Sequence, residues 1–345
     1  MTEKKYIYDL TLDELQELLM DWGEPKFRAK QIWQGLYQNL WQNPKEFRNI
    51  PKDLQEKLEE HISFSHLKPL TKLKSGDGAT EKVLFQLPDN NAIETVLMEY
   101  DKRRTICIST QAGCALGCVF CATGQMGFKK NLSSGEISEQ VLYFAKQLKE
   151  KDEKVTNVVV MGMGEPFHNY DQTLAAVDRL NDPEGLNLGA RRFTISTVGL
   201  VLAIKRFAKE KRQVNLAISL HAANDELRSS MLPVNDRYPI QELIAACHEY
   251  VEISHRRISF EWALIQGNND NDEDAHELGR LLEGLLCHVN IIPLNPTEGY
   301  EGKRSTKESV SNFQNILEEY AIPCTVRIRR GIDIQAGCGQ LAINN

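Results

Sequence analysis

The sequence of 345 residues contains no uninterrupted apolar run close to the roughly 18 residues that a membrane-spanning helix requires. Its first residues, MTEKKYIYDL, also lack the basic segment, apolar core and small-residue cleavage site of a secretion signal. Both absences argue against a membrane or secreted protein, so we expect a cytoplasmic location and no membrane contact. In a reducing compartment we expect the eight cysteines to form no structural disulfides.

An excess of positive charge is missing as well. The chain has 41 lysine and arginine residues against 48 acidic residues, a net charge of −7 at pH 7, which argues against indiscriminate binding to nucleic acid. Any basic surface must therefore be local. The candidate phosphate contacts are Lys102, Arg103 and Arg104, Lys129 and Lys130, Arg191 and Arg192, and Arg327, Arg329 and Arg330.

The first 65 residues are rich in helix signals and predict a small helical domain over residues 1–65. Thr11 and Glu14 form a capping-box pattern, and Pro25 suits the first turn of a second helix. The predicted inward face of that helix is Phe27, Ile32, Trp33 and Leu36, and its predicted exposed cations are Lys26, Arg28 and Lys30. These cations form either a solvated face or an RNA contact.

Further along the chain the apolar pattern changes. Residues 81–87 and 91–100 have the pattern of strands, within a β-rich connector over residues 66–99. Strands and amphipathic helices then alternate about six times, which predicts parallel βα units. Six units are too few for a closed eight-stranded barrel. The expected fold class is therefore α/β, with a partial (β/α)6 barrel over residues 100–342.

Three cysteines follow the first strand of the expected barrel. Cys114, Cys118 and Cys121 have the spacing CxxxCxxC, so one loop could hold a metal centre. Structural zinc usually takes four protein ligands from two pairs, and no second CxxC pair is present. Three thiolates suit a [4Fe-4S] cluster with one iron left open to a substrate or cofactor. Zinc with a further ligand and uncoordinated thiols are the alternatives.

Several segments resemble a known family. CALGCVFCATGQMGFKKNL, GMGEP, RRFTISTVG, AISLHAANDELR, IIPLNP and DIQAGCGQL, in this order, resemble the RlmN/Cfr group of radical SAM RNA methyltransferases. The segments span most of residues 80–342, and the helical amino terminus is similar to that of the RlmN branch. The resemblance implies a radical SAM core in which the open iron of the cluster binds S-adenosylmethionine.

The resemblance also implies which residues contact the cofactor. Gly164 and Glu165 of GMGEP match residues that bind the methionyl amino group, although the glycines by themselves could equally mark a strand-ending turn. The other matching positions are Ser196, Ser219, Leu220, His221 and Asn295, each at the end of an expected strand.

Two isolated cysteines remain. Cys338 lies between Gly337 and Gly339, and by its sequence context it could be a reactive thiol, a fourth cluster ligand or a packing residue. The resemblance implies that one S-adenosylmethionine methylates Cys338 and that a second supplies the radical that activates this methyl group for addition to adenine, so two are used per turnover. It also implies that Cys107 then attacks Cys338 and frees the product through a transient disulfide.

Glu94 matches the proton acceptor proposed for the family. Its neighbours Ala92, Val96 and Met98 alternate with a period of two, an apolar setting that would raise the pKa of the carboxyl group. Without the resemblance, a surface glutamate on an edge strand would be the simpler interpretation. Cys247, Cys287 and Cys324 are expected to be packing residues.

The resemblance implies methylation of carbon 2 of an adenine in the peptidyl-transferase region of 23S rRNA, and of the adenine next to the anticodon in some tRNAs. It implies an electron donor such as flavodoxin or ferredoxin, and we expect a monomer. One alternative is the Cfr activity at carbon 8 of the same rRNA adenine, because Ile332 stands where many RlmN sequences carry an acid. An alternative of a different class is a zinc-stabilised RNA-binding protein without catalysis.

Overall fold

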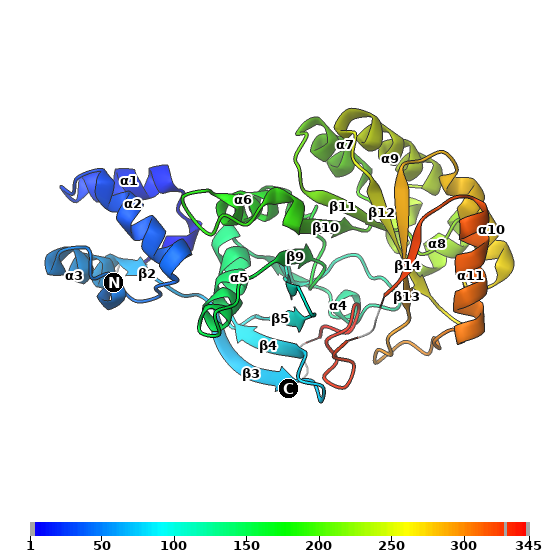
Figure 1. Cartoon of the computed structure of the whole chain (residues 1–345), viewed down its shortest axis with the longest axis horizontal. Helices are drawn as coiled ribbons and strands as arrows, with labels where there is room; N and C mark the ends of the chain where they lie inside the picture. The colour runs from blue at the N-terminus through cyan, green and yellow to red at the C-terminus, as the bar shows by residue number, and fades with distance from the viewer. Residues whose placement is uncertain (1–3, 328–329, 343–345) are drawn as a thin grey trace.

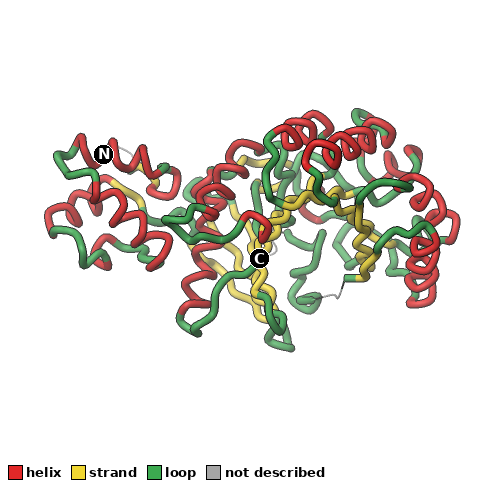
Figure 2. The backbone as a smooth tube through the Cα atoms, turned by 45° about the horizontal axis from the view of Figure 1, so that its top comes forward, coloured by secondary structure: helices red, strands yellow, loops and turns green. Residues whose placement is uncertain are grey.

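The structure, a computed structural model, describes residues 4–327 and 330–342. A small helical unit leads into three antiparallel strands, which continue into a curved sheet of parallel strands (Figure 1). The helical unit lies at one end of the molecule in both views (Figure 2). Helices cover the outside of the curved sheet, so its inner side and its strand ends are left to form a site (Figure 1).

The N-terminal unit contains the helices that the sequence predicts. The elements are α1 (Leu12–Asp21), α2 (Phe27–Gln34), a π-helical turn η2 (Gly35–Asn39), α3 (Lys52–His61), and the paired short strands β1 (Lys5–Tyr6) and β2 (Ile62–Ser63). The predicted capping box is confirmed, because the Thr11 and Glu14 side chains each accept a hydrogen bond from the other residue's backbone N–H.

The predicted inward face of the second helix is confirmed for three residues and wrong for Phe27. Ile32, Trp33 and Leu36 are buried, whereas Phe27 is 56% exposed. Phe27 lies five residues before Ile32, which places it about 140° around the helix from Ile32 and on the side opposite the buried face. Arg28, predicted to face outward, is half-buried, and its guanidinium carbon lies 4.9 Å from the centre of the Phe27 ring.

Three antiparallel strands join this unit to the barrel: β3 (Lys68–Lys74), β4 (Thr80–Gln86) and β5 (Ala92–Glu99). The sequence predicts β4 and β5 but not β3, whose residues KPLTKLK are all exposed and lack an apolar face. Its lysines are typical of a protected sheet edge. β5 pairs with both β4 and β6, so the interpretation of Glu94 as a surface residue on an edge strand is wrong.

The parallel strands are β6 (Arg104–Cys107), β9 (Asn157–Val160), β10 (Phe193–Thr197), β11 (Asn215–Ser219), β12 (Ile258–Leu264), β13 (Cys287–Pro293) and β14 (Cys324–Val326). The helices between them are α5 (Ser134–Lys149), α6 (Tyr170–Asn181), α7 (Val201–Lys209), α9 (Ile240–Ser254), α10 (Asp272–Leu282) and α11 (Lys307–Glu319). Shorter elements are η1 (Ile7–Asp9), η3 (Pro44–Glu46), β7 (Gln111–Gly113), α4 (Ala122–Gln125), β8 (Phe128–Asn131), η4 (Ala190–Arg192), α8 (Asp225–Met231) and η5 (Pro233–Asp236).

All ten strands from β3 to β6 and β9 to β14 form one sheet, in the order β14-β13-β12-β11-β10-β9-β6-β5-β4-β3. Six βα units run from β6 to α11, and β14 adds a seventh parallel strand. Because β3 and β14 end the sheet without pairing to each other, the barrel is open. The predicted fold class is confirmed. None of the helices in the described part of the chain is both long enough and apolar enough to cross a membrane.

Candidate active site

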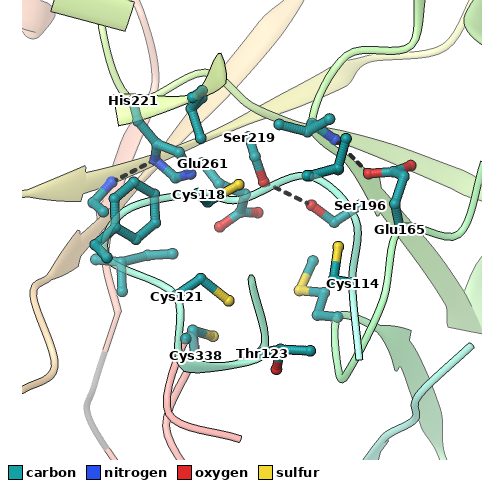
Figure 3. Close-up of a pocket in the computed structure, with 18 of the residues that line it drawn as sticks. Cys114, Cys118, Cys121, Thr123, Glu165, Ser196, Ser219, His221, Glu261 and Cys338 are labelled. Atoms are coloured by element: carbon teal, nitrogen blue, oxygen red, sulfur yellow. Dashed lines mark hydrogen bonds between the residues drawn. The ribbon is translucent and has the colours of Figure 1, made fainter. Parts of the chain in front are cut away.

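A cavity opens where the parallel strands end, as active sites do in barrels of this kind (Figure 3). Its lining joins the CxxxCxxC loop, the ends of five strands and the C-terminal segment. Ten residues singled out from the sequence line it: Cys114, Cys118, Cys121, Gly164, Glu165, Ser196, Ser219, His221, Asn295 and Cys338. Leu220, Glu94 and Cys107 lie outside this lining.

The three cysteines of the motif lie on the loop between β7 and α4, around one end of the cavity (Figure 3). Cys114 donates its N–H to Gly127 O at 3.2 Å, and Cys121 donates to Cys118 O at 3.1 Å, so backbone bonds hold the loop. Burial raises the pKa of all three thiols, that of Cys114 to about 11. A bound cationic centre reverses this shift and keeps such thiols ionised.

This set of donors fits an iron-sulfur cluster. Within residues 4–327 and 330–342, no group of three His, Cys, Asp or Glu side chains is placed to hold a single metal ion. A cluster bound through three cysteines spreads its ligands over different irons, so the thiols need only surround a common space. Cys114, Cys118 and Cys121 do so from a single loop.

The GMGEP segment follows β9 and packs closely against the chain after β6. Gly164 has φ +100°, and a Cβ there would lie 2.5 Å from Cβ of Gln111, so glycine is required on steric grounds alone. The Glu165 carboxylate accepts N–H groups of Phe167 at 3.0 Å and Val198 at 2.9 Å. Burial nevertheless raises the pKa of Glu165 to about 7, and a cationic ammonium group bound there would favour the ionised form.

The next strand ends supply hydroxyl and imidazole groups. Ser196 and Ser219, at the ends of β10 and β11, place their Oγ atoms 3.4 Å apart on the cavity wall. His221 has φ +61°, and its Nδ1 accepts the N–H of Ala263 at 2.8 Å. Burial lowers the pKa of His221 to about 3, so the ring is neutral with its proton on Nε2. The ring therefore both stabilises the fold and presents a donor to the cavity.

The last two predicted cofactor contacts differ in exposure to the cavity. Asn295 lines it and donates through Nδ2 to Cys338 O at 3.1 Å, which ties the C-terminal segment to the end of β13. Leu220 is fully buried behind the wall, and its N–H binds Glu261 O at 3.1 Å. The Leu220 side chain lies outside the lining, between the lining residues Ser219 and His221 in the sequence.

Cys338 connects the main cavity with a smaller cavity that also contains Cys107. Both cavities include Met161, Ile292, Asn295 and Cys338, and Cys107 lines only the smaller one. Cys338 is exposed, whereas Cys107 is buried at the end of β6. Burial raises the pKa of Cys107 to about 12, and the nearby Cys338 sulfur adds to the shift. Two cysteines separated by 231 positions in the sequence therefore share one small space.

Glu94 lies on the inner face of β5, beneath the C-terminal segment. Its carboxylate forms an ion pair with Lys82 at 2.8 Å and accepts the N–H of Ala342 at 2.9 Å. Burial raises the pKa of Glu94, and both contacts partly offset that effect. Because Val96 of β5 pairs with Cys107 of β6, Glu94 is on the same face of the sheet as the Cys107 thiol.

Two charged residues of the site were not singled out as such from the sequence. Glu261, on β12, lines the main cavity, and its Oε1 accepts a hydrogen bond from Asn290 Nδ2 at 2.9 Å. Arg327, a candidate phosphate contact, lies beside Glu261 and Cys338: Nη2 is 3.4 Å from Glu261 Oε1, and Nη1 is 4.0 Å from Cys338 Sγ. A period-two strand pattern marks Glu261 as inward-facing, but nothing in the sequence pairs it with Arg327.

The other basic clusters contain both cations that are paired with carboxylates and cations that are exposed. Arg104 is bound to Glu153, and Lys130 lies 3.1 Å from both Asp89 and Glu136, so carboxylates already neutralise these cations. Exposed cations from the predicted clusters are Lys102, Arg103, Lys129, Arg191 and Arg192. Arg329 lies outside the described residues.

Arg228 is a further buried cation, and its replacement by methionine is expected to destabilise the fold. It donates to Val198 O at 2.6 Å, Asn235 Oδ1 at 2.8 Å and Leu220 O at 3.2 Å, behind the cavity wall. Leaving these buried acceptors unsatisfied should lower the free energy of unfolding by about 3 kcal/mol. Urea denaturation measures this value. The exposed Arg206→Met is the control and should leave the denaturation curve nearly unchanged.

Comparison with known proteins gives consistent matches over the whole chain. A model of the radical SAM superfamily matches residues 108–279, and a model of the ribosomal RNA large subunit methyltransferase N-terminal domain matches residues 6–64. The chain is 51% identical to a probable dual-specificity RNA methyltransferase RlmN of Chloroflexus aurantiacus, over 99% of this chain and 93% of that protein. It is 50% identical to an RlmN of Myxococcus xanthus, over 97% and 93%.

A solved structure matches equally well. The crystal structure of a radical SAM methyltransferase from Sphaerobacter thermophilus has a TM-score of 0.96 and 50% sequence identity, and the match covers 98% of this chain and 99% of that one. The similarity therefore extends over the N-terminal helices, the antiparallel strands and the open barrel together.

Proposed function

The chain belongs to the RlmN family of radical SAM methyltransferases, and from this premise we propose that it methylates carbon 2 of an adenine in 23S rRNA and in some tRNAs. The rRNA target would be in the peptidyl-transferase region, and the tRNA target next to the anticodon. The observation that carries the proposal is the place of Cys338: a thiol from the C-terminal segment lines the same cavity as the three cysteines of the motif.

The cofactors of this superfamily are a [4Fe-4S] cluster and S-adenosylmethionine, which together supply a carbon radical when they are bound. In our proposal Cys114, Cys118 and Cys121 hold the cluster, and Gly164 and Glu165 hold the methionyl end. The hydroxyl and imidazole wall binds the rest of the cofactor through Ser196, Ser219, His221 and Asn295, with Leu220 behind it. Two S-adenosylmethionine molecules are consumed per turnover.

The reacting side chains in our proposal are Cys338, Glu94 and Cys107. Cys338 accepts a methyl group on its sulfur and carries it to the adenine. Glu94 takes the proton that leaves the ring, for which its raised pKa is favourable. Cys107 then attacks the Cys338 sulfur: an S–S bond forms, the carbon–sulfur bond to the base breaks, and the released carbon takes up a proton to become the methyl group. A thiol reductant reopens the disulfide before the next turnover. Burial raises the pKa of Cys107 to about 12, so this thiol is protonated at neutral pH before the reaction.

RNA would approach from the open side of the barrel. The exposed cations Lys102, Arg103, Lys129, Arg191 and Arg192 would contact phosphates, and the helical domain over residues 1–65 would bind the RNA fold. The target adenine must leave its stack to reach Cys338. We further propose a monomer in which residues 66–99 connect this domain to the core over residues 100–342, and reduction by a protein such as flavodoxin or ferredoxin.

Mass spectrometry of nucleosides from treated RNA tests the proposal. Protein reconstituted anaerobically with iron and sulfide, then given S-adenosylmethionine, a reductant and unmodified rRNA or tRNA, should form 2-methyladenosine in both RNAs. 8-Methyladenosine would instead assign the Cfr reaction. Colourless protein that binds only zinc and yields neither nucleoside would contradict the enzyme and favour a non-catalytic RNA-binding protein.

A further inference from the structure

A buried ion pair outside the cofactor cavity links Lys82 to Glu94. The Lys82 Nζ and Glu94 Oε1 atoms are 2.8 Å apart, and the two side chains are only 6% and 3% exposed. In the antiparallel register Leu84 lies opposite Glu94, so Lys82 is the diagonal neighbour of Glu94 on the same face. Burying both charges costs solvation, which suggests that the pair does more than join two strands that are already hydrogen-bonded.

Both members of the pair also bind the C-terminal segment. Lys82 Nζ donates to Gln335 O at 3.2 Å, and Glu94 Oε2 accepts the N–H of Ala342 at 2.9 Å. These contacts are three residues before Cys338 and four residues after it. The ion pair therefore fixes both ends of residues 335–342, which we call the Cys338 loop.

The other side of the Cys338 loop is attached to the cavity. Ala122 N donates to Gly339 O at 2.8 Å, Thr123 Oγ1 donates to Leu341 O at 2.6 Å, and Asn295 Nδ2 donates to Cys338 O. The loop thus lies between the α4 region that follows the motif cysteines and the Lys82–Glu94 pair. In this position the Cys338 side chain lies close to Cys121, on the cavity side (Figure 3).

From these contacts we propose that Lys82 is a positioning residue that, through Glu94, latches the Cys338 loop in the place where Cys338 faces the cofactor cavity. Its ammonium group keeps the buried Glu94 carboxylate ionised, and the ionised carboxylate is the stronger acceptor for Ala342 N–H. The latch itself is independent of the proposed function. Its meaning for catalysis, the orientation of a methyl-carrying thiol and of its proton acceptor together, rests on that function.

Hydrogen exchange measured by mass spectrometry on the full-length protein tests the latch without cofactor or RNA. Lys82→Met and Glu94→Gln should each speed exchange in the peptide that covers residues 335–342 by about tenfold or more, because each removes charge-assisted bonds that close the loop. Lys82→Arg keeps a charge and donors and should restore most of the protection. Lys68→Met, on the exposed β3 strand, should change nothing in this peptide.

Peptides from α9 and α10 distinguish local opening of the Cys338 loop from a general loss of stability. Their exchange should be the same in the variants as in the unmodified protein. If a single variant does not fold, the double variant Lys82→Met with Glu94→Gln replaces the pair by neutral groups and should expose the same peptide as much as either single change does. Unchanged protection of residues 335–342 in these variants would overturn the latch. The two tests are separate. Unchanged protection would not contradict the proposed methylation, and absence of methylated nucleoside would not contradict the latch.

Discussion

Protein in which Cys107 is replaced by alanine is expected to stay covalently bonded to its RNA after one turnover. In the proposed reaction Cys338 carries the methyl carbon onto adenine, and only a second thiol can attack the Cys338 sulfur to release it. Cys107 and Cys338 line one small cavity, and among the residues around it that the structure describes they are the two thiols. Without Cys107, methylated product should fall by at least about a hundredfold while adduct accumulates.

A denaturing gel and intact-mass analysis measure the adduct, which should disappear after nuclease treatment except for a remnant nucleotide on Cys338. Two variants make the test specific. Cys338→Ala should give neither adduct nor product, because the methyl carrier is absent. Cys287→Ala changes a buried cysteine that lies outside both cavities and should turn over normally. If Cys107→Ala protein carries no bound RNA and forms the normal amount of product, the proposed role of Cys107 is wrong.

Most of the predicted site residues line one cavity for a simple physical reason. In an α/β barrel each parallel strand delivers its last residues to the same rim, so a residue placed at a strand end in the sequence is placed at the site in space. Gly164, Ser196, Ser219 and Asn295 line one cavity for this reason, although they are spread over 132 positions. The family resemblance picks out these positions, and the alternation of strands and helices explains why they meet in space.

Side-chain contacts across the sheet cannot be predicted from the order of strands and helices alone. The pairing of β5 with β6 makes the antiparallel strands continuous with the barrel, and this non-local register brings Glu94 under the C-terminal segment. The sequence pairs neither Lys82 with Glu94 nor Arg327 with Glu261, because the partners come from separate strands or from distant parts of the chain. The sequence does not predict β3, because the residues of this exposed edge strand do not alternate between apolar and polar.

The two proposed cysteine roles differ in what the protein does to each thiol. Cys107 is buried on a strand of the sheet, where the pKa is raised and the backbone is fixed by pairing on both sides. Cys338 is exposed on a loop between two glycines and is positioned by hydrogen bonds rather than by a strand. In our proposal the exposed thiol carries the methyl carbon, and the buried thiol resolves the adduct.

Replacing Cys118 by alanine is expected to abolish the iron-sulfur cluster and with it all cleavage of S-adenosylmethionine. Cys118 belongs to the loop whose three thiols line one end of the cavity. Two remaining thiolates cannot hold a cluster that already has one iron without a protein ligand, so bound iron after anaerobic reconstitution should fall from about four per chain to nearly none. Iron analysis and the visible absorbance of the brown protein measure this loss independently of activity.

Cys247→Ala is the matched control, because Cys247 is fully buried in α9 and is absent from the cavity lining. It should retain the full iron content and cofactor cleavage, with only a modest loss of stability from the small cavity that it creates. The Cys118 variant should keep its fold, since Cys118 is only partly buried and the loop backbone is held by Cys121 N–H to Cys118 O and by Val119 N–H to Met231 O. Retention of the iron by Cys118→Ala would mean that another group completes the site, and the role of the CxxxCxxC loop as sole cluster ligand would be wrong.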